Sequence, residues 1–244
     1  GISVLEPETG RFTNYIHSSK DDSSIGEGGM ISIAEDAKKR IWIATWNGGI
    51  NLAVPNKEGG FSFRRFFPNN IPHFWALHLD AAGRFWVSTF GDGLLLMKTD
   101  DSQPLEKLVP KFVQFINNKG MPNSLSSNSI VDIQDDSQGF IWLSTTVGLN
   151  VFNPASLQPQ SMSLEELETA KKSVKFKSFK HKYDAISTIP SPMVHGINIA
   201  KSGMMWACSS DGIAVFEPRS QAFWPIYFPT ENIDEVMTFQ AIEE

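Results

Sequence analysis

Apolar and polar residues alternate in short runs along most of this chain, and one such run occurs four times. Each copy contains a tryptophan, followed three positions later by a hydroxyl residue and six or seven positions later by a glycine. The copies are the segments 41–50, 84–96, 140–152 and 204–216, which carry Trp42, Trp86, Trp142 and Trp206. Similarity at several fixed offsets predicts a repeat protein.

The pattern within each copy predicts four β-strands. An apolar pair precedes each tryptophan by at most nine residues, which leaves room only for a hairpin. After each tryptophan strand comes a turn containing glycine; three of these turns, 47–49, 92–93 and 211–212, pair glycine with Asn or Asp, residues that tolerate positive φ. A third strand follows each turn. The fourth strands are rich in aromatic and β-branched residues and are expected at 61–66, 112–116, 174–179 and 223–228.

Antiparallel four-stranded units with a period of roughly forty to fifty residues predict an all-β fold, the β-propeller. Successive tryptophans are 44, 56 and 64 residues apart, and loop insertions account for this drift. A capping box that begins at Ser163 predicts one helix at 163–172, which we expect to project from the face opposite the turns that follow the tryptophan strands. The expected blades are 30–66, 74–116, 129–180, which contains the helix, and 194–228.

Both ends of the chain match parts of the repeat. Residues 1–15 resemble its third and fourth strands, and residues 236–244 resemble the first strand of a further blade. No residues remain to supply the missing tryptophan strand between them. We therefore expect a partial propeller, an open arc of four full blades with a partial blade at each end, whose exposed strand edges pair with further blades or with a second copy.

Composition and charge narrow the class of protein. The 244 residues are 41% hydrophobic and 20% charged, which is typical of a soluble protein with a substantial core. The net charge of −6 disfavours a nucleic-acid partner, and we expect no local basic cluster to offset it. Cys208 occupies a position where the other repeats have Ala or Ser, so we expect a buried structural thiol.

The repeat resembles the two-component regulator propeller family. The resemblance rests on Asp135-Asp136, on Gly139 and on the sequence Ile-Trp-Leu-Ser-Thr at 141–145, together with the Asn-Ser-Leu-Ser spacing at 123–126. It extends over nearly the whole chain. The departures are small: the family's glycine before the threonine is Ala, Ser or Cys here, and no glycine follows Asp36 at its corner.

This resemblance implies a role as well as a fold. Members of the family are extracytoplasmic sensor regions, usually with seven-bladed propellers followed by a membrane helix and a histidine kinase or another output domain. Many respond to an oligosaccharide. The resemblance therefore implies a periplasmic segment of an inner-membrane protein, with an oligosaccharide and the remaining domains of the same protein as its partners.

The sequence supplies loose parts of a catalytic site but no constellation, so we expect no catalytic residues, no metal and no cofactor. His78 alternates with two leucines in a predicted strand, which favours a structural histidine with its hydrogen bonds satisfied. The pair Asp135-Asp136 could act as a general acid and base. Acidic pairs also stand at the same repeat position at 35–36 and 243–244, which favours a turn device.

The repeated tryptophans lie among apolar neighbours, and all four are expected in the core. Aromatic residues outside the repeat pattern are better candidates for stacking on a sugar ring, and Asn or Asp side chains beside them could bind hydroxyls. Because the second turn of a blade and the connection to the next blade emerge at the same end, these candidates share one face. Packing within the protein is an equally open explanation. The candidate ligand-binding residues are Trp46, Asn47, His73, Trp75, Phe90, Asp92 and Asp211.

Three functions remain open from the sequence. The leading hypothesis is a non-catalytic ligand-sensing propeller. A polysaccharide-active propeller enzyme, a lyase or glycosidase, would instead release reducing ends from a glycan. A protein-interaction scaffold would bind a partner protein without responding to a small molecule.

Overall fold

A computed structural model describes residues 1–183, 188–217 and 220–227, and nearly all of its regular structure is β-sheet. One sheet has two strands and four have four antiparallel strands each. The predicted all-β propeller of four-stranded antiparallel units is confirmed in this part of the chain. The predicted strand at 236–244 lies outside the described residues.

The four larger sheets are formed by consecutive segments of the chain, and the two-stranded hairpin precedes them. The hairpin is β1 (Ile2–Glu6) with β2 (Arg11–Tyr15). The first blade is β3 (Met30–Glu35), β4 (Ile41–Thr45), β5 (Ile50–Pro55) and β6 (Phe61–Phe66). A short 3-10 turn, η1 (Pro68–Asn70), leads to the second, β7 (Phe74–Leu79), β8 (Phe85–Thr89), β9 (Leu94–Lys98) and β10 (Lys111–Phe115). The third is β11 (Ile130–Asp135), β12 (Ile141–Thr145), β13 (Gly148–Phe152) and β14 (Lys177–Phe179), and the fourth is β15 (Val194–Ile199), β16 (Met205–Ser209), β17 (Gly212–Glu217) and β18 (Ala222–Tyr227).

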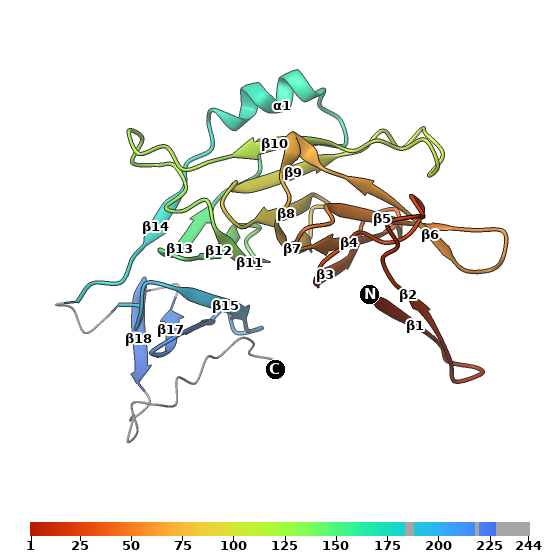
Figure 1. Cartoon of the computed structure of the whole chain (residues 1–244). Helices are drawn as coiled ribbons and strands as arrows, with labels where there is room; N and C mark the ends of the chain where they lie inside the picture. Colours follow the sequence, from red (N-terminus) through yellow and green to blue (C-terminus); the bar gives the residue numbers. More distant parts are fainter. Residues whose placement is uncertain (184–187, 218–219, 228–244) are drawn as a thin grey trace.

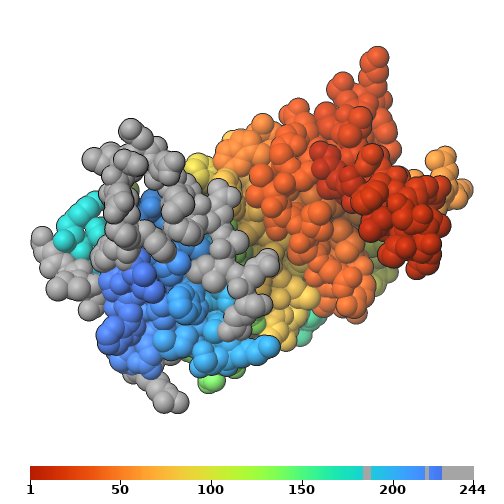
Figure 2. All heavy atoms as spheres, turned by 90° about the horizontal axis from the view of Figure 1, so that it is seen from below, coloured from red at the N-terminus to blue at the C-terminus, as the bar shows by residue number. Residues whose placement is uncertain are grey.

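The blades follow one another along an open arc (Figure 1). Adjacent blades approach each other through their first strands, β3, β7, β11 and β15, which therefore form the inner side of the arc. In Figure 2 the β1–β2 hairpin, in red, and the fourth blade, in blue, lie at opposite ends of the molecule. The described sheets do not close into a ring, as the sequence predicted for a partial propeller.

A glycine in the turn between the second and third strands lets that turn approach the outer strand. Gly93 has φ +85°, and a Cβ at this position would lie 2.1 Å from the Phe115 carbonyl oxygen. Gly148 has φ +102° and would place a Cβ 2.1 Å from the Phe179 carbonyl oxygen. Both contacts are far below van der Waals distance, so only glycine fits this repeat position.

An aspartate holds the tryptophan in three of the blades. The Trp86 indole N–H donates to Asp80 Oδ2 at 2.8 Å, while Asp80 Oδ1 accepts the backbone N–H groups of Ala82 and Arg84. Asp36 and Asp136 hold Trp42 and Trp142 in the same way, at 2.7 Å and 2.9 Å. The second residue of the acidic pair is therefore a turn device.

Each buried tryptophan also contacts an aromatic ring of the next blade. Trp42 lies 6.3 Å from Phe85, and Trp86 lies 5.4 Å from Phe152, measured between ring centroids. Trp42 and Trp86 are fully buried, and Trp142 is 7% exposed.

The expectation that all four tryptophans lie in the core is wrong for Trp206. Its side chain is only partly buried. Ala200 stands where the other blades have the aspartate, so this repeat lacks the carboxylate that accepts the indole N–H.

All four inner strands contain a β-bulge, and in β7, β11 and β15 the backbone N–H after the bulge donates to a side chain. Ser32 Oγ accepts the Leu77 N–H of the next blade at 3.1 Å. Asp132 occupies the equivalent position and accepts the Ile197 N–H of the next blade at 3.0 Å. The second blade has Ala76 at this position, and a methyl group cannot accept a hydrogen bond from the third blade. The Ile133 N–H of the third blade therefore donates to Asp132, its own neighbour, at 2.8 Å. One carboxylate thus completes two bulges.

The single helix of the described chain, α1 (Leu164–Lys171), has the capping box that the sequence predicted at Ser163. It packs on β10 of the preceding blade through Leu167, which is fully buried (Figure 1). The helix lies against this outer strand because its one buried leucine needs an apolar surface. That it projects from the face opposite the turns after the tryptophan strands stays a prediction. The outer strand that follows it starts at Lys177 and not at Val174.

Candidate functional site

Four of the seven candidate residues form a single cluster of rings, which we call the aromatic cluster: Trp46, His73, Trp75 and Phe90. Trp46 is in the turn between β4 and β5, and Phe90 is in the corresponding turn of the second blade. His73 and Trp75 lie where the chain enters β7. The topology of a blade brings its second turn and the incoming connection to the same end, so the predicted juxtaposition occurs.

The rings of the aromatic cluster are in direct contact. Trp46 stacks on His73 with a centroid distance of 4.6 Å and an angle of 21°. The same indole meets Trp75 edge-on at 5.4 Å and Phe90 at 5.4 Å, and Trp75 lies 5.7 Å from Phe90. Phe90 is 37% exposed, and the other three are partly buried. The cluster therefore presents aromatic surface to solvent instead of closing it off.

Backbone hydrogen bonds fix the positions of these rings. His73 Nδ1 contacts the Trp46 carbonyl oxygen, which places the imidazole under the indole. The Phe90 N–H donates to the His73 carbonyl at 3.2 Å, and the Trp46 N–H donates to the Gly29 carbonyl at 2.9 Å. The turns of two blades are thus tied to one loop, and the cluster is part of a rigid scaffold. Such sites lose little conformational entropy on binding.

The remaining candidates are not all near the cluster. Asn47 is exposed in the same turn as Trp46. Asp92 is partly buried two residues after Phe90, and its carbonyl accepts a hydrogen bond from Gln114 Nε2 at 2.7 Å. Asp211 is exposed in the turn of the fourth blade, two blades farther along the arc. The structure therefore brings Asn47 and Asp92, but not Asp211, to the blades that carry the cluster.

His78 and Asp135 join neighbouring blades. His78 Nε2 lies 2.8 Å from Asp135 Oδ1, and Asp135 Oδ2 accepts the Ala81 N–H at 2.9 Å. His78 thus has a hydrogen-bond partner, as expected for a structural histidine. The expectation that both members of the acidic pair serve their own turn is wrong for Asp135, whose carboxylate reaches the preceding blade.

Two titratable groups of the fourth blade have shifted pKa values. Burial lowers the pKa of His195, whose Nε2 lies 3.0 Å from the Ser210 hydroxyl. Burial raises the pKa of the Cys208 thiol, which is fully buried and contacts the Gly196 carbonyl. A raised pKa leaves little thiolate at neutral pH, so this cysteine is structural and not reactive.

The sequence contained one signal that our interpretation overlooked. The segment 171–182 carries six lysines and no acidic residue, which contradicts the expectation that the chain has no local basic cluster. They are Lys171, Lys172, Lys175, Lys177, Lys180 and Lys182. Three of them line a cavity that is described below.

Two further properties concern the described residues alone. Their His, Cys, Asp and Glu side chains form no group of three or more that could hold a metal ion. Within the same ranges, no helix has the length and hydropathy required to cross a membrane.

The fold and the repeated aspartate–tryptophan corner define a β-propeller. Solved propellers share this fold at low sequence identity. PorZ, a surface component of the type-IX secretion system of Porphyromonas gingivalis, is 14% identical with a TM-score of 0.60 over 93% of this chain and 31% of its own. Virginiamycin B lyase from Staphylococcus aureus is 12% identical with a TM-score of 0.51 over 89% of this chain and 60% of its own. This chain therefore spans 31% of the first protein and 60% of the second.

Residues 124–146 match the family model described as "Two component regulator propeller". The matched segment includes β11, β12 and the corner between Asp136 and Trp142, so the chain carries a repeat of this family. The extracellular domain of a hybrid two-component system from B. thetaiotaomicron, BT3049, is 17% identical with a TM-score of 0.46 over 88% of this chain and 32% of its own. A comparison with curated proteins found no match.

Proposed function

We propose that this chain is part of a non-catalytic, extracytoplasmic sensor propeller of a bacterial two-component signalling protein, and that its ligand is an oligosaccharide. The family match supports the signalling context, because the matched repeat is the one after which that family is named. The remaining blades and the output domain of the same protein are its expected partners.

The aromatic cluster is the observation that carries the proposal. Aromatic rings that stay partly exposed on a rigid surface offer flat apolar faces to a pyranose ring, while amide and carboxylate groups beside them satisfy the hydroxyls. Phe90 and Trp46 provide such faces, and Asn47 is the exposed polar side chain next to them. A pure packing role would leave these rings covered, as Trp42 and Trp86 are.

The proposal is tested by screening a panel of neutral and acidic oligosaccharides for changes in intrinsic tryptophan fluorescence. A ligand that binds the cluster should shift the emission of Trp46 and Trp75. Trp46→Ala should weaken that ligand by roughly tenfold or more, since stacking and aromatic contacts are worth about 0.5–1.5 kcal/mol beyond their buried area. The variant should keep the wild-type circular dichroism spectrum.

Trp224→Ala is the matched control. Trp224 is a 60% exposed tryptophan on β18, outside the aromatic cluster, and its loss should leave binding unchanged. If both variants lost the same affinity for the oligosaccharide, or if the ligand bound at the fourth blade, the aromatic cluster would not be the binding site. Release of reducing ends from any glycan would favour the enzyme, and binding of a partner protein without a glycan response would favour the scaffold.

A further inference from the structure

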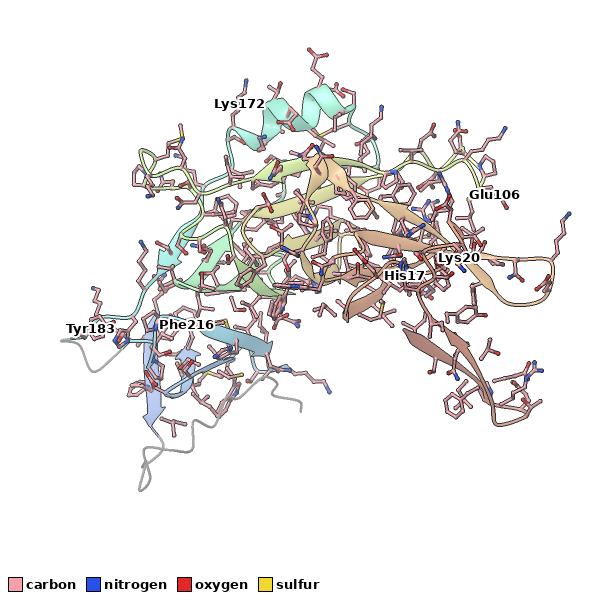
Figure 3. All side chains as sticks on the ribbon, viewed as in Figure 1. His17, Lys20, Glu106, Lys172, Tyr183 and Phe216 are labelled. Atoms are coloured by element: carbon pink, nitrogen blue, oxygen red, sulfur yellow. The ribbon has the colours of Figure 1, made fainter. Side chains whose placement is uncertain are left out.

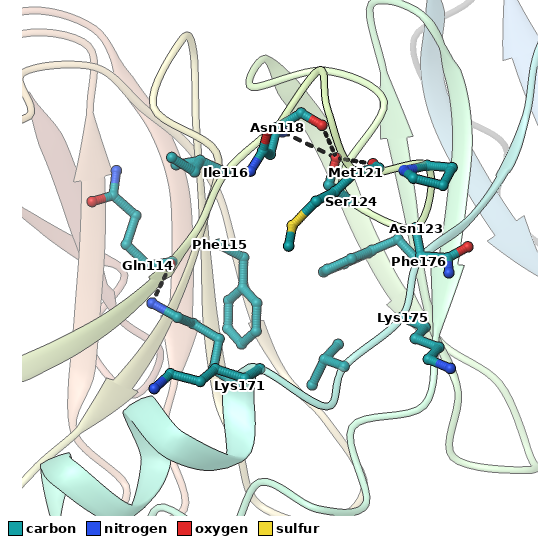
Figure 4. Close-up of a pocket in the computed structure, with 13 residues that line it drawn as sticks. Gln114, Phe115, Ile116, Asn118, Met121, Asn123, Ser124, Lys171, Lys175 and Phe176 are labelled. Carbon is teal, nitrogen blue, oxygen red and sulfur yellow. Dashed lines mark hydrogen bonds between the residues drawn. The ribbon is translucent and has the colours of Figure 1, made fainter.

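A cavity of about 450 Å³ lies at the outer edge of the arc, on the second and third blades (Figure 4). Its walls are β10, the connecting loop 117–124 and the segment 171–176, which ends α1 and continues past it. None of the aromatic-cluster residues lines it. The helix insertion creates the cavity, because the chain leaves α1 and crosses opposite the loop before β14 begins.

The inner surface of the cavity is apolar. Phe115 and Phe176 are 4% and 5% exposed, and their rings meet edge-on with centroids 5.9 Å apart. Figure 4 shows Met121 extending between these two rings from the loop above. Met121 is nonetheless 61% exposed. A flexible thioether over a buried aromatic base can adapt to apolar ligands of different shapes.

The rim is basic. Three lysines line the cavity, and its described lining contains no Asp or Glu. Lys171 is already engaged, since its ammonium lies 2.5 Å from Glu168 Oε2 and donates to the Gln114 carbonyl at 3.1 Å. Lys172 and Lys175 are exposed, and neither forms an ion pair within the described part of the chain. Lys172 points to solvent at the end of the helix (Figure 3), and flexible four-carbon stems allow both ammonium groups to turn toward a bound anion.

A second cavity, of about 520 Å³, provides an internal comparison because it lies at the equivalent loop two repeats earlier. Tyr15 and Ile16 line it where Phe115 and Ile116 line the first. Asp21, however, replaces Met121 at the equivalent position of the loop. Aromatic rings line both cavities, since Phe61 and Phe63 line the earlier one. Its lining also carries Asp21 and Glu58, so a rim of lysines without a carboxylate distinguishes the cavity beside α1 from it.

We propose that the cavity beside α1 binds an organic anion with an apolar body. The apolar part would lie on Phe115, Phe176 and Met121, and a carboxylate or sulfonate would meet the ammonium groups of Lys172 and Lys175. Charge complementarity favours this ligand class. The net charge of −6 disfavours anion binding over most of the surface, whereas the lysine-rich segment attracts anions. The inference does not rest on the sensor role proposed above.

The test uses a pair of fluorescent probes with the same rings. 1-Anilinonaphthalene-8-sulfonate carries a sulfonate, and N-phenyl-1-naphthylamine does not. The chain should bind the sulfonate saturably and more tightly than the neutral probe, with an affinity that falls as salt is added. The double variant Lys172→Gln with Lys175→Gln should weaken binding of the sulfonate probe by roughly tenfold and leave binding of the neutral probe unchanged. The tenfold figure follows because each exposed ion pair contributes a factor of up to about five to the affinity.

Two variants distinguish this site from others. Lys180→Gln with Lys182→Gln removes the same charge from the same segment outside the cavity, and should leave sulfonate binding unchanged. Met121→Asp introduces, at an exposed position, the residue that the earlier loop has as Asp21, and it should weaken binding of both probes. The proposal is overturned if the wild-type chain shows no saturable binding, if both lysine pairs have equal effects, or if only Trp46→Ala reduces binding, which would move the anion to the aromatic cluster.

Discussion

A single aspartate accepts the indole N–H of the repeated tryptophan in three of the four blades. Asp80 accepts the Trp86 indole N–H, and its Oδ2 also lies 2.6 Å from Arg84 Nε. The carboxylate is 1% exposed, so these partners replace the water that it loses on folding. Trp206 lacks this support, because the equivalent residue is Ala200. The repeated tryptophan is therefore expected to contribute less to stability in the fourth blade than in the second.

Trp86→Ala is expected to lower the free energy of unfolding by roughly 3–5 kcal/mol, the usual cost of truncating a buried aromatic residue. Trp206→Ala should cost much less, because that ring is already partly exposed and its repeat has no aspartate to lose. Urea denaturation followed by circular dichroism measures both changes. Equal shifts of the unfolding midpoint would show that burial is not what separates the two tryptophans.

The inner strands depend on side chains to complete their bulges, and this gives one of them a dependence on pH. Asp132 accepts two backbone N–H groups, one from its own blade and one from β15. Burial nevertheless raises the pKa of its carboxyl group above the ordinary value of 3.8, because the charged form loses water that two hydrogen bonds do not fully replace.

The folded chain therefore holds the Asp132 proton more tightly than the unfolded chain does. This contribution to stability is complete below the ordinary pKa of 3.8 and is lost as the pH rises through the raised folded-state value. Asp132→Asn should remove this contribution, so that the free energy of unfolding declines less between pH 4 and neutrality than in the wild type. Asp211→Asn, the same change at an exposed turn, controls for the loss of one charge, and an identical effect there would refute the assignment.

The described molecule as a whole leaves apolar strand surface uncovered at one end of the arc. Leu5, Phe12 and Ile16 are 48%, 61% and 73% exposed on or beside the β1–β2 hairpin. A two-stranded hairpin is marginally stable alone, and this one is anchored by Tyr15, which contacts Phe61 and Phe63 of the first blade. Unpaired edges with exposed apolar residues favour pairing with another strand.

We expect this chain to self-associate as its concentration rises, through the β1–β2 hairpin. Phe12→Lys should reduce the association measured by sedimentation velocity, because a charge on an edge strand opposes edge-to-edge pairing. Val109→Lys changes a similarly exposed apolar residue, 60% exposed, in a loop of the second blade and should have no effect. A chain that stays monomeric throughout, or that responds equally to both variants, contradicts the prediction.

Much of the fold and part of the site could be predicted because they depend on local pattern. Period-two alternation and the turn glycines define the strands, and the parity of strands in a blade brings Trp46, His73 and Phe90 to one end. The positive charge of the lysine-rich segment is also visible in the sequence. Its position beside a cavity could not be predicted, because the cavity exists only where α1 folds back on β10.

The sequence by itself determined the all-β class, the four-stranded unit and the positions of the turns, because each depends on neighbours within a few residues. Only the tertiary structure decided how deeply each repeated tryptophan is buried and which side chains join neighbouring blades. Trp206 has the repeat pattern but is only partly buried, and Asp135 pairs with His78 at a separation of 57 residues. Burial and long-range hydrogen bonds depend on the surface that a neighbouring blade presents, and no local pattern contains that surface.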